Sequence, residues 1–442
     1  MLAPLVALAF SSLDEILNDP KLSGAVVSCT VADESGNVVY ERNSSTRVMP
    51  ASNQKLLSNS YALFELGPDF RPETKIWNLK DHVVVDSPGD PMMSHERLEK
   101  AAQILGLGKR KPVWVHEAYR PLIPPSWEWD DLPNKYAAPV TAFTVDRGSI
   151  ELWTEGEKLS ILPLNYGLVA RRGTKAGPRK VTYDPIRHTL TVDGDLPKAK
   201  TKIDTLALEL PDACAASFLG RRFSLTDHSP KSPPSLILGG PPLSATIKEC
   251  LVHSDNNIAE NLLLMAAGSD KPLGTDPYAT AETALSHFLI STVGVEAGDF
   301  HPEDGSGMSR HDVVTTRGIV KLLQWALKQP TKDVWLDALA KPGAGTLQDR
   351  LAGVPFVGKT GTLDMVVALS GYVHTSRNRT LTVSLIFNQF ACGEKDARSI
   401  ADEFIKKLVA DDGFGTVPAS AGNHEACSAH PCSHSSDVRR NP

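Results

Sequence analysis

Three short motifs hold residues that could together perform acyl transfer on a serine side chain. Along the chain of 442 residues they occur in the order Ser52-Asn53-Gln54-Lys55, Ser254-Asp255-Asn256 and Lys359-Thr360-Gly361. These strings fit the patterns S-x-x-K, S-D-N and K-T-G of a serine acyl-transfer site. Each one alone would more often be a helix cap or a turn. Because all three occur in this order, we predict that they form one site.

The first motif supplies a nucleophile and a base. A serine hydroxyl is a poor nucleophile until a base takes its proton. Residues i and i+3 share a helix face, so the amine of Lys55 is predicted to lie within reach of Ser52. Lysine acts as a base only when it is neutral, and burial and a nearby cation, here Lys359, lower its pKa. The free N–H of Ser52 at the helix start could hold an oxyanion.

The second motif supplies groups that could handle the peptide substrate. Ser254 could relay a proton between Lys55 and a leaving amine. The side-chain amide of Asn256 can both donate and accept hydrogen bonds, so it could hold a substrate amide. Ser254 is therefore a candidate for proton transfer and Asn256 for substrate binding.

The third motif is predicted to lie on a strand that binds the substrate. Gly361 would leave room for a substrate backbone along the strand edge. The N–H of Thr362 could be the second oxyanion donor. Lys359 with Thr360 or Thr362 would form a pocket for a carboxylate. The motifs together predict a site for an acyl donor that ends in a free carboxylate.

Bulk composition argues against several classes of protein. Hydrophobic residues make up 41% and charged residues 22%, which is typical of a globular chain. The net charge of −6 gives no reason to expect nucleic acid as a partner. No run of about twenty apolar residues is present, so no membrane-spanning helix is predicted. The six cysteines are widely spaced and fit neither a disulfide framework nor a zinc site.

The N-terminus has features of an export signal. The run Leu2–Phe10 is apolar, and Ala7-Leu8-Ala9 resembles an A-x-A cleavage site, although a basic region before the run is missing. We therefore predict an export signal that is incomplete at its start, and a periplasmic or extracytoplasmic protein. The alternative is that this run leads into a first helix at Ser12–Leu17.

The elements that must position the motifs form an α+β pattern. Two strands are predicted near the N-terminus and three near the C-terminus, which gives a five-stranded antiparallel sheet covered by helices. The strands are expected at 25–31, 38–40, 356–362, 366–373 and 381–387, and helices at 52–66, 242–268 and 397–409.

The long gap between the first two motifs indicates an inserted region. Residues 73–240 are rich in Pro and in short β-like runs, and could comprise two subdomains, one nested in the other. Because Lys55 and Ser254 must meet, the segment between them must leave the domain and return. We therefore predict a discontinuous domain at 11–72 and 241–412, interrupted by the insert, and a disordered tail at 413–442. The tail holds His424, Cys427, His430, Cys432 and His434, whose spacing matches no metal site that we can defend.

Longer strings around the motifs resemble a known family, the D-alanyl-D-alanine carboxypeptidase/endopeptidase penicillin-binding proteins of low molecular mass. The matching strings extend over most of the chain. They are Pro50–Leu56 (P-A-S-N-Q-K-L), Gly89-Asp90-Pro91, Trp129-Asp130-Asp131 with Tyr136-Ala137-Ala138-Pro139, Ser254–Glu260 and Asp304–Arg310 (D-G-S-G-M-S-R).

This resemblance implies a transpeptidase/β-lactamase-like domain and a serine peptidase without a cofactor or metal. The implied substrates are peptidoglycan stem peptides, and β-lactam antibiotics are the implied covalent inhibitors of Ser52. By position, Asp131 and Tyr136 would recognise the free amino end of a diaminopimelate side chain, with Met308 and Arg310 lining the same pocket. A structural ion pair is the alternative role of Asp131.

Two positions depart from the family's pattern. Met308 replaces the usual Leu, which is a small change. Asp364 puts a charge where a small or apolar residue is expected, so the sequence does not decide which substrate side chain the pocket prefers. The sequence also does not distinguish carboxypeptidase activity from endopeptidase activity. A β-lactamase and a non-catalytic cell-wall-binding protein are the alternative functions, although no loop typical of a deacylating Glu is evident.

Overall fold

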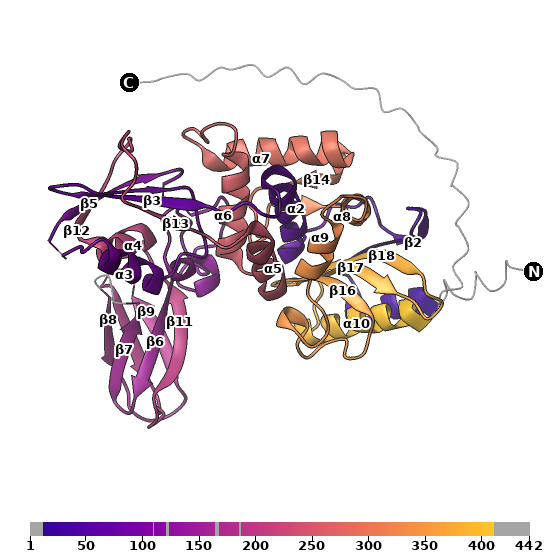
Figure 1. The fold of residues 1–442 in the computed structure, drawn as a ribbon. Helices are drawn as coiled ribbons and strands as arrows, with labels where there is room; N and C mark the ends of the chain where they lie inside the picture. Colours follow the sequence, from indigo (N-terminus) through magenta and orange to yellow (C-terminus); the bar gives the residue numbers. More distant parts are fainter. Residues whose placement is uncertain (1–11, 109, 121–122, 164–167, 185–186, 411–442) are drawn as a thin grey trace, which may run out of the picture.

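A five-stranded sheet is formed by the N-terminal hairpin and by three strands near the C-terminus (Figure 1). The computed structural model describes residues 12–108, 110–120, 123–163, 168–184 and 187–410. All neighbouring strands pair antiparallel, and the N-terminal hairpin lies beside the C-terminal strands. The predicted α+β class with this sheet is confirmed. The strand order is β16 (Phe356–Leu363), β17 (Val366–His374), β18 (Thr380–Asn388), β1 (Val26–Ala32) and β2 (Val38–Arg42).

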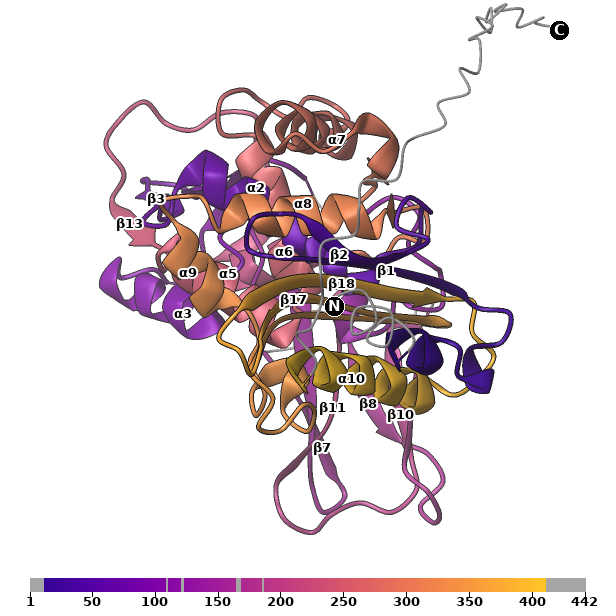
Figure 2. The same ribbon diagram turned by 90° about the vertical axis from the view of Figure 1, so that its right-hand side faces the viewer.

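Each face of this sheet is covered by helices (Figure 2). On β17, Val367 and Leu369 face a core formed with α10 (Glu394–Ala410), whereas Ala368 and Tyr372 face the core of the other helices. Successive strand residues point to opposite faces, so burial of both faces requires apolar or small side chains at nearly every position. The second core contains α2 (Gln54–Leu66), α5 (Leu243–His253), α6 (Asn256–Ala267), α7 (Pro277–His287), α8 (Thr316–Ala326) and α9 (Lys332–Ala338).

Two of the predicted helices differ from the expectation at the motifs. The single helix expected at 242–268 is wrong, because α5 ends at His253 and α6 begins at Asn256. Ser254 takes a left-handed conformation with φ 60°, and the Asp255 side chain accepts a hydrogen bond from the N–H of Ile258. An aspartate that caps a new helix competes with continuation of the old one. The helix expected from Ser52 begins instead with a 3₁₀ turn, η2 (Ala51–Asn53).

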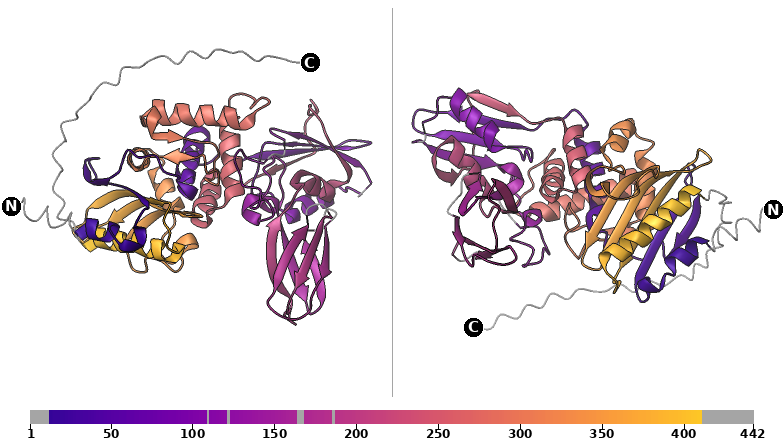
Figure 3. Two further views of the ribbon diagram at one scale, coloured as in Figure 1. Left: turned by 180° about the vertical axis from the view of Figure 1, so that it is seen from behind. Right: turned by 90° about the horizontal axis from the view of Figure 1, so that it is seen from below.

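Within its described residues, the insert folds into three further sheets and the α-helices α3 and α4. Figure 3 shows it beside the rest of the chain from two further sides. A five-stranded mixed sheet has the order β12-β5-β4-β3-β13, and two three-stranded sheets follow the orders β11-β6-β7 and β8-β10-β9. The bounds are β3 (Glu73–Asn78), β4 (Val83–Ser87), α3 (His95–Ile104), β5 (Pro112–Glu117), β6 (Ser149–Glu155), β7 (Lys158–Leu162), β8 (Val169–Arg172), β9 (Lys180–Asp184), β10 (Thr189–Asp193), β11 (Thr201–Ala207), α4 (Pro211–Leu219), β12 (Arg221–Leu225) and β13 (Leu236–Gly239).

The insert begins and ends on neighbouring strands. β3 pairs antiparallel with β13, with Thr74 opposite Leu238, so the chain leaves the helical part and returns to it side by side. The strands β6–β11 lie in sequence between α3 and α4, and thus within the segment that builds the five-stranded sheet. The domain boundaries at 72/73 and 240/241 stay a prediction.

Several expectations concern segments at the ends of the chain. Residues 12–17 are helical, where the alternative interpretation of the N-terminus places a first helix. The export segment at 2–10 and the tail at 413–442 lie outside the described residues. No helix in the described part of the chain is long and apolar enough to cross a membrane.

The loop between β14 (Phe300–His301) and β15 (Val313–Val314) packs tightly against η2 through a glycine. Gly307 has φ +82°, and a side chain there would collide with the carbonyl oxygen of Ala51. Ala51 itself has a positive φ of 47°. Left-handed backbone costs a non-glycine residue roughly 1–2 kcal/mol. The position of Ser52 thus depends on close backbone contact at Gly307.

We expect Gly307→Ala to destabilise the fold more than the same change at Gly343, which also has a positive φ but open space around it. Gly343→Ala should cost about 1 kcal/mol, whereas Gly307→Ala adds a steric penalty of about 1–3 kcal/mol. Urea unfolding followed by circular dichroism measures both. Equal losses for the two variants would show that the contact with Ala51 is loose.

Candidate active site

Ser52 lies on η2, which is fixed to the central sheet. The side chain of Asn53 donates a hydrogen bond to the hydroxyl of Ser370 on β17 (2.7 Å), and Ser370 in turn contacts Ser384 on β18 (2.9 Å). All three side chains are buried. Because buried polar groups are held in place by their partners, this chain of contacts sets the position of Ser52 relative to the sheet.

Lys55 lies fully buried beneath Ser52. Its Nζ donates to the hydroxyl of Ser52 (3.0 Å), to Oδ1 of Asn256 (2.6 Å) and to the carbonyl oxygen of Ser306 (2.7 Å). Burial lowers the pKa of Lys55, and nearby acidic groups offset part of this effect. The amine is therefore within reach of the hydroxyl, as the i, i+3 spacing predicts. Its hydrogen-bond partners are neutral oxygens rather than carboxylates.

A second buried lysine faces the second motif. Nζ of Lys359 donates to the hydroxyl of Ser254 (2.9 Å) and to the carbonyl oxygen of Thr360 (2.8 Å). Burial lowers the pKa of Lys359 well below its ordinary value, and the charge of Lys55 lowers it further. The sequence suggested a relay from Ser254 to Lys55, whereas the structure pairs Ser254 with Lys359. The sequence predicted that Lys359 lowers the pKa of Lys55, whereas here the charge of Lys55 lowers the pKa of Lys359.

Asn256 bridges the first motif and the insert. Its Oδ1 accepts a hydrogen bond from Lys55, and its Nδ2 donates to the carbonyl oxygen of Tyr136 (2.8 Å). The next residue toward the N-terminus, Asp255, forms an ion pair with Arg147 (3.2 Å), which also binds Glu249 (2.8 Å). The insert therefore holds the second motif from two sides. The role of Arg147 carries no sequence signal, because its partners lie about a hundred residues away.

The third motif lies on β16. The structure explains its glycine by packing inside the protein, whereas the sequence suggested room for a substrate backbone. A side chain at Gly361 would approach the carbonyl oxygen of Pro50 at 2.9 Å and Cβ of Ala51 at 3.1 Å. The glycine therefore allows η2 to pack on β16. Thr360 is buried. Thr362 lines the cavity described next, and its hydroxyl accepts a hydrogen bond from Arg398 on α10 (3.3 Å).

Most of the predicted site residues line one cavity of about 300 Å³. Lys55 and Lys359 lie buried behind it, and Thr360 and Gly361 are not part of its lining. Sequence reasoning missed four lining residues, Glu128, Gly307, Leu363 and Glu394. Of these, Glu394 has no local signal, because α10 meets the third motif only in the folded chain. The lining comprises Ser52, Glu128, Asp131, Tyr136, Ser254, Asn256, Gly307, Met308, Arg310, Thr362, Leu363, Asp364 and Glu394.

The residues predicted to recognise a substrate side chain lie together at this cavity. The hydroxyl of Tyr136 donates to Oδ1 of Asp131 (2.8 Å), and Nε of Arg310 donates to Glu128 (2.8 Å). Partial burial and then the bond to Asp131 raise the pKa of Tyr136 to about 12. Partial burial also raises the pKa of Asp131. Tyr136 therefore stays protonated and uses its hydroxyl hydrogen on Asp131, so this pair presents the oxygen atoms of the Asp131 carboxylate and of the Tyr136 hydroxyl to the cavity.

A buried aspartate shapes the loop that carries Ser306, Gly307 and Met308. The carboxylate of Asp304 accepts backbone N–H bonds from Ser306 (2.9 Å), Gly307 (2.6 Å) and Ser309 (2.8 Å), and a bond from Trp127 of the insert (2.8 Å). These bonds turn the carbonyl of Ser306 toward Lys55. The D-G-S-G string was the signal for this loop, but its contact with the lysine was not predicted.

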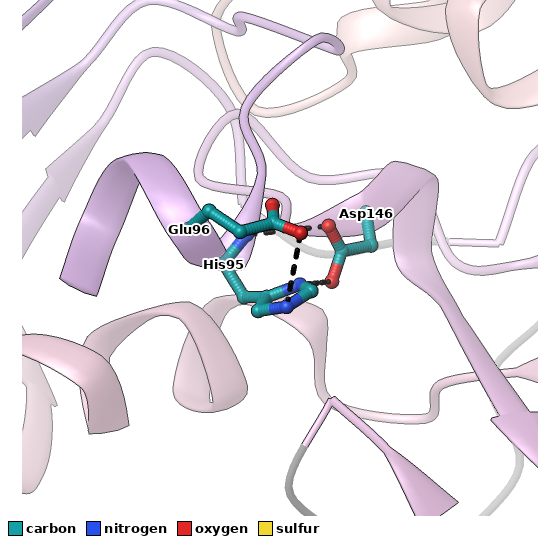
Figure 4. Close-up of side chains that lie close together, drawn as sticks. All are labelled: His95, Glu96 and Asp146. Carbon is teal, nitrogen blue, oxygen red and sulfur yellow. Dashed lines mark hydrogen bonds and ion pairs between the residues drawn. The ribbon is translucent and has the colours of Figure 1, made fainter. Parts of the chain in front are cut away.

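One group of side chains within the described ranges has the chemistry of metal ligands (Figure 4). His95, Glu96 and Asp146 bring their ligand atoms within 4.8 Å of one another. Both ring nitrogens of His95 face carboxylates, at 2.7 Å from Asp146 and 3.2 Å from Glu96. This arrangement is satisfied as a set of ion pairs. None of these residues lines the cavity at Ser52.

The chain is similar to known D-alanyl-D-alanine carboxypeptidases over most of its length. The sequence profile of the D-Ala-D-Ala carboxypeptidase 3 (S13) family matches residues 9–409. A D-alanyl-D-alanine carboxypeptidase of Actinomadura sp. (strain R39) is 29% identical over 424 residues, covering 82% of this chain and 77% of the relative. The D-alanyl-D-alanine carboxypeptidase DacB of Haemophilus influenzae is 23% identical over 414 residues, covering 82% and 85%.

Solved structures share the fold. Penicillin binding protein 4 (dacB) of Haemophilus influenzae superposes with a TM-score of 0.73 at 21% identity, covering 90% of this chain and 98% of the other. The same protein complexed with a novel β-lactam gives a TM-score of 0.69 at 19% identity, with the same coverage. The predicted resemblance and the predicted class of serine-type peptidase are confirmed. Because the family profile covers most of the sequence, this chain belongs to the D-Ala-D-Ala carboxypeptidase 3 (S13) family.

Proposed function

We propose that Ser52 is the nucleophile of this serine D,D-peptidase, and that its substrates are peptidoglycan stem peptides ending in D-Ala-D-Ala. One observation carries the assignment: the amine of buried Lys55 lies 3.0 Å from the hydroxyl of Ser52 at the cavity. A base at hydrogen-bond distance from a serine is the geometry that activates the nucleophile. The enzyme would act outside the cytoplasm, where its polymer substrate lies.

Acylation would begin when neutral Lys55 accepts the proton of Ser52. The serine oxygen forms a bond to the carbonyl carbon of the penultimate D-Ala, and the N–H groups of Ser52 and Thr362 hold the oxyanion. The C–N bond then breaks, and Lys55 gives its proton to the leaving amine by way of Ser254. The burial that lowers the pKa of Lys55 supports this role, because a lysine with an ordinary pKa would stay charged.

Deacylation would return Ser52 to its starting state. Water attacks the carbonyl carbon of the ester while Lys55 takes its proton, the bond from that carbon to the Ser52 oxygen breaks, and Lys55 gives the proton to this oxygen as the shortened peptide leaves. A β-lactam would acylate Ser52 by opening its ring, so its leaving amine stays attached. The β-lactam complex of the related Haemophilus protein supports this proposal. The two lining glutamates are held in ion pairs, Glu128 with Arg310 and Glu394 with Arg398, so the described cavity offers no free glutamate to speed deacylation as in a β-lactamase.

Labelling with a fluorescent penicillin tests the nucleophile. Wild-type protein should form a stable labelled band, and Ser52→Ala should lose it, because no other group would form the ester. Ser399→Ala is the matched control, since Ser399 is exposed on α10. Ser58 is a poor control because it is buried and donates to the carbonyl oxygen of Gly305. An unlabelled wild type, or a labelled Ser52→Ala, would refute the assignment. Rapid turnover of a chromogenic cephalosporin would favour the β-lactamase alternative.

The pH dependence of acylation tests the base. Only the neutral amine accepts a proton, so the acylation rate should rise with pH and level off above the pKa of Lys55. Because burial lowers this pKa, the midpoint should lie below the ordinary value of 10.5. Stopped-flow labelling from pH 5 to 10 measures it. Lys55→Arg keeps the charge but cannot lose its proton near neutral pH, so it should lose roughly a thousandfold in rate. A rate that falls as pH rises would rule out this role.

A further inference from the structure

Acidic side chains dominate the active-site cavity. Its lining contains the carboxylates of Glu128, Asp131, Asp364 and Glu394, and Arg310 is the one basic residue in that lining as described. Glu394 is further paired with Arg398 at the edge (2.6 Å). A cavity with an excess of negative charge attracts cations and disfavours anions.

The guanidinium of Arg310 is already engaged by protein groups. Its Nε donates to Glu128 at 2.8 Å, and its Nη1 approaches the carbonyl oxygen of Asp364 at 3.3 Å. Its Nη2 lies 3.7 Å from the carboxylate of Asp364. A substrate carboxylate would have to displace these partners to bind Arg310. Beyond the pocket predicted for the terminal carboxylate, the described lining of the cavity therefore offers no unpaired cation to a further carboxylate of the substrate.

Asp364 lies at the same cavity as Asp131 and Tyr136, but it comes from a distant part of the sequence. It follows β16 at the turn into β17, whereas Asp131 belongs to the insert, and its side chain is 84% exposed. Burial raises the pKa of Asp131, the hydrogen bond from Tyr136 lowers it, and the charges of Glu128, Asp130 and Asp364 raise it further. An ammonium placed between Asp131 and Asp364 would relieve this repulsion.

We propose that this subsite selects a third stem residue whose side chain ends in an amine without a free carboxylate, and that Asp364 sets this preference. The inference rests on the proposed function. A lysine-like side chain, or a diaminopimelate whose distal carboxylate is a carboxamide, has this chemistry. The ammonium binds Asp131 and Asp364, and the neutral amide lies beside Arg310 without opposing the carboxylates. A free distal carboxylate meets Glu128 and Asp364 at the same place.

A matched substrate pair tests this preference. Purified full-length protein is given stem peptides ending in D-Ala-D-Ala, and their cross-linked dimers, in which the third residue is diaminopimelate either as the free acid or as its distal carboxamide. Product masses over time give kcat/KM for each. We expect the wild type to favour the carboxamide by roughly fivefold or more at low ionic strength, and salt to reduce the ratio.

The variant Asp364→Asn removes one charge and keeps the shape. It should reduce the carboxamide-to-acid ratio by roughly three- to fivefold, which is the scale of a partly exposed charge. Asp81→Asn is the matched control, because Asp81 is exposed in the insert between β3 and β4. Asp81→Asn should keep both the penicillin labelling and the substrate ratio of the wild type, and circular dichroism checks that both variants are folded.

The outcomes separate the inference from the proposed function. A wild type that labels with penicillin but cleaves both substrates equally, or prefers the free acid, overturns the inference alone. An unchanged ratio in Asp364→Asn removes Asp364 as its cause. A protein that neither labels nor cleaves any of the peptides overturns the proposed function, and the inference falls with it.

Discussion

This site depends on one constraint. Two lysines are buried in it, and neither amine has a carboxylate within hydrogen-bond distance. Burial of an ammonium is costly unless other groups compensate it. Lys55 and Lys359 meet neutral oxygens instead, from serine hydroxyls, an asparagine amide and backbone carbonyls. A directly paired carboxylate would raise the pKa of each amine and keep it charged. The site therefore needs carbonyl groups held rigidly in place, and the loop organised by Asp304 supplies one of them.

The insert contributes to this rigidity as well as to the cavity wall. It contacts the site through the carbonyl of Tyr136, the guanidinium of Arg147 and the indole of Trp127. The first two hold the motif at Ser254-Asp255-Asn256, and the third holds Asp304. The helix break at Ser254 is thus held by contacts from the inserted segment. The insertion, which looks like a topological complication, gives the second motif its support.

Local patterns predicted the features that arise within short segments. Short runs of apolar and β-branched residues indicated the five strands, and the spacing of Ser52 and Lys55 placed hydroxyl and amine together, because both depend on neighbours in sequence. Contacts between distant segments left no such trace. The pairing of Ser254 with Lys359, the clamp at Arg147 and the arrival of Glu394 all depend on tertiary packing. The break between α5 and α6 was missed because apolar periodicity continues through it, and only Asp255 as a cap signals it.

The antiparallel pair of β3 and β13 gives the insert a narrow neck. Since both ends of the inserted segment are held next to each other, the distance that it must span is independent of its length. The entropic penalty for closing a longer segment grows only slowly with its length. Residues added or removed in the insert away from Trp127, Tyr136 and Arg147 would leave α2 and α5, and with them Ser52 and Ser254, where they are. The insert could thus change in length while the reacting groups keep one geometry.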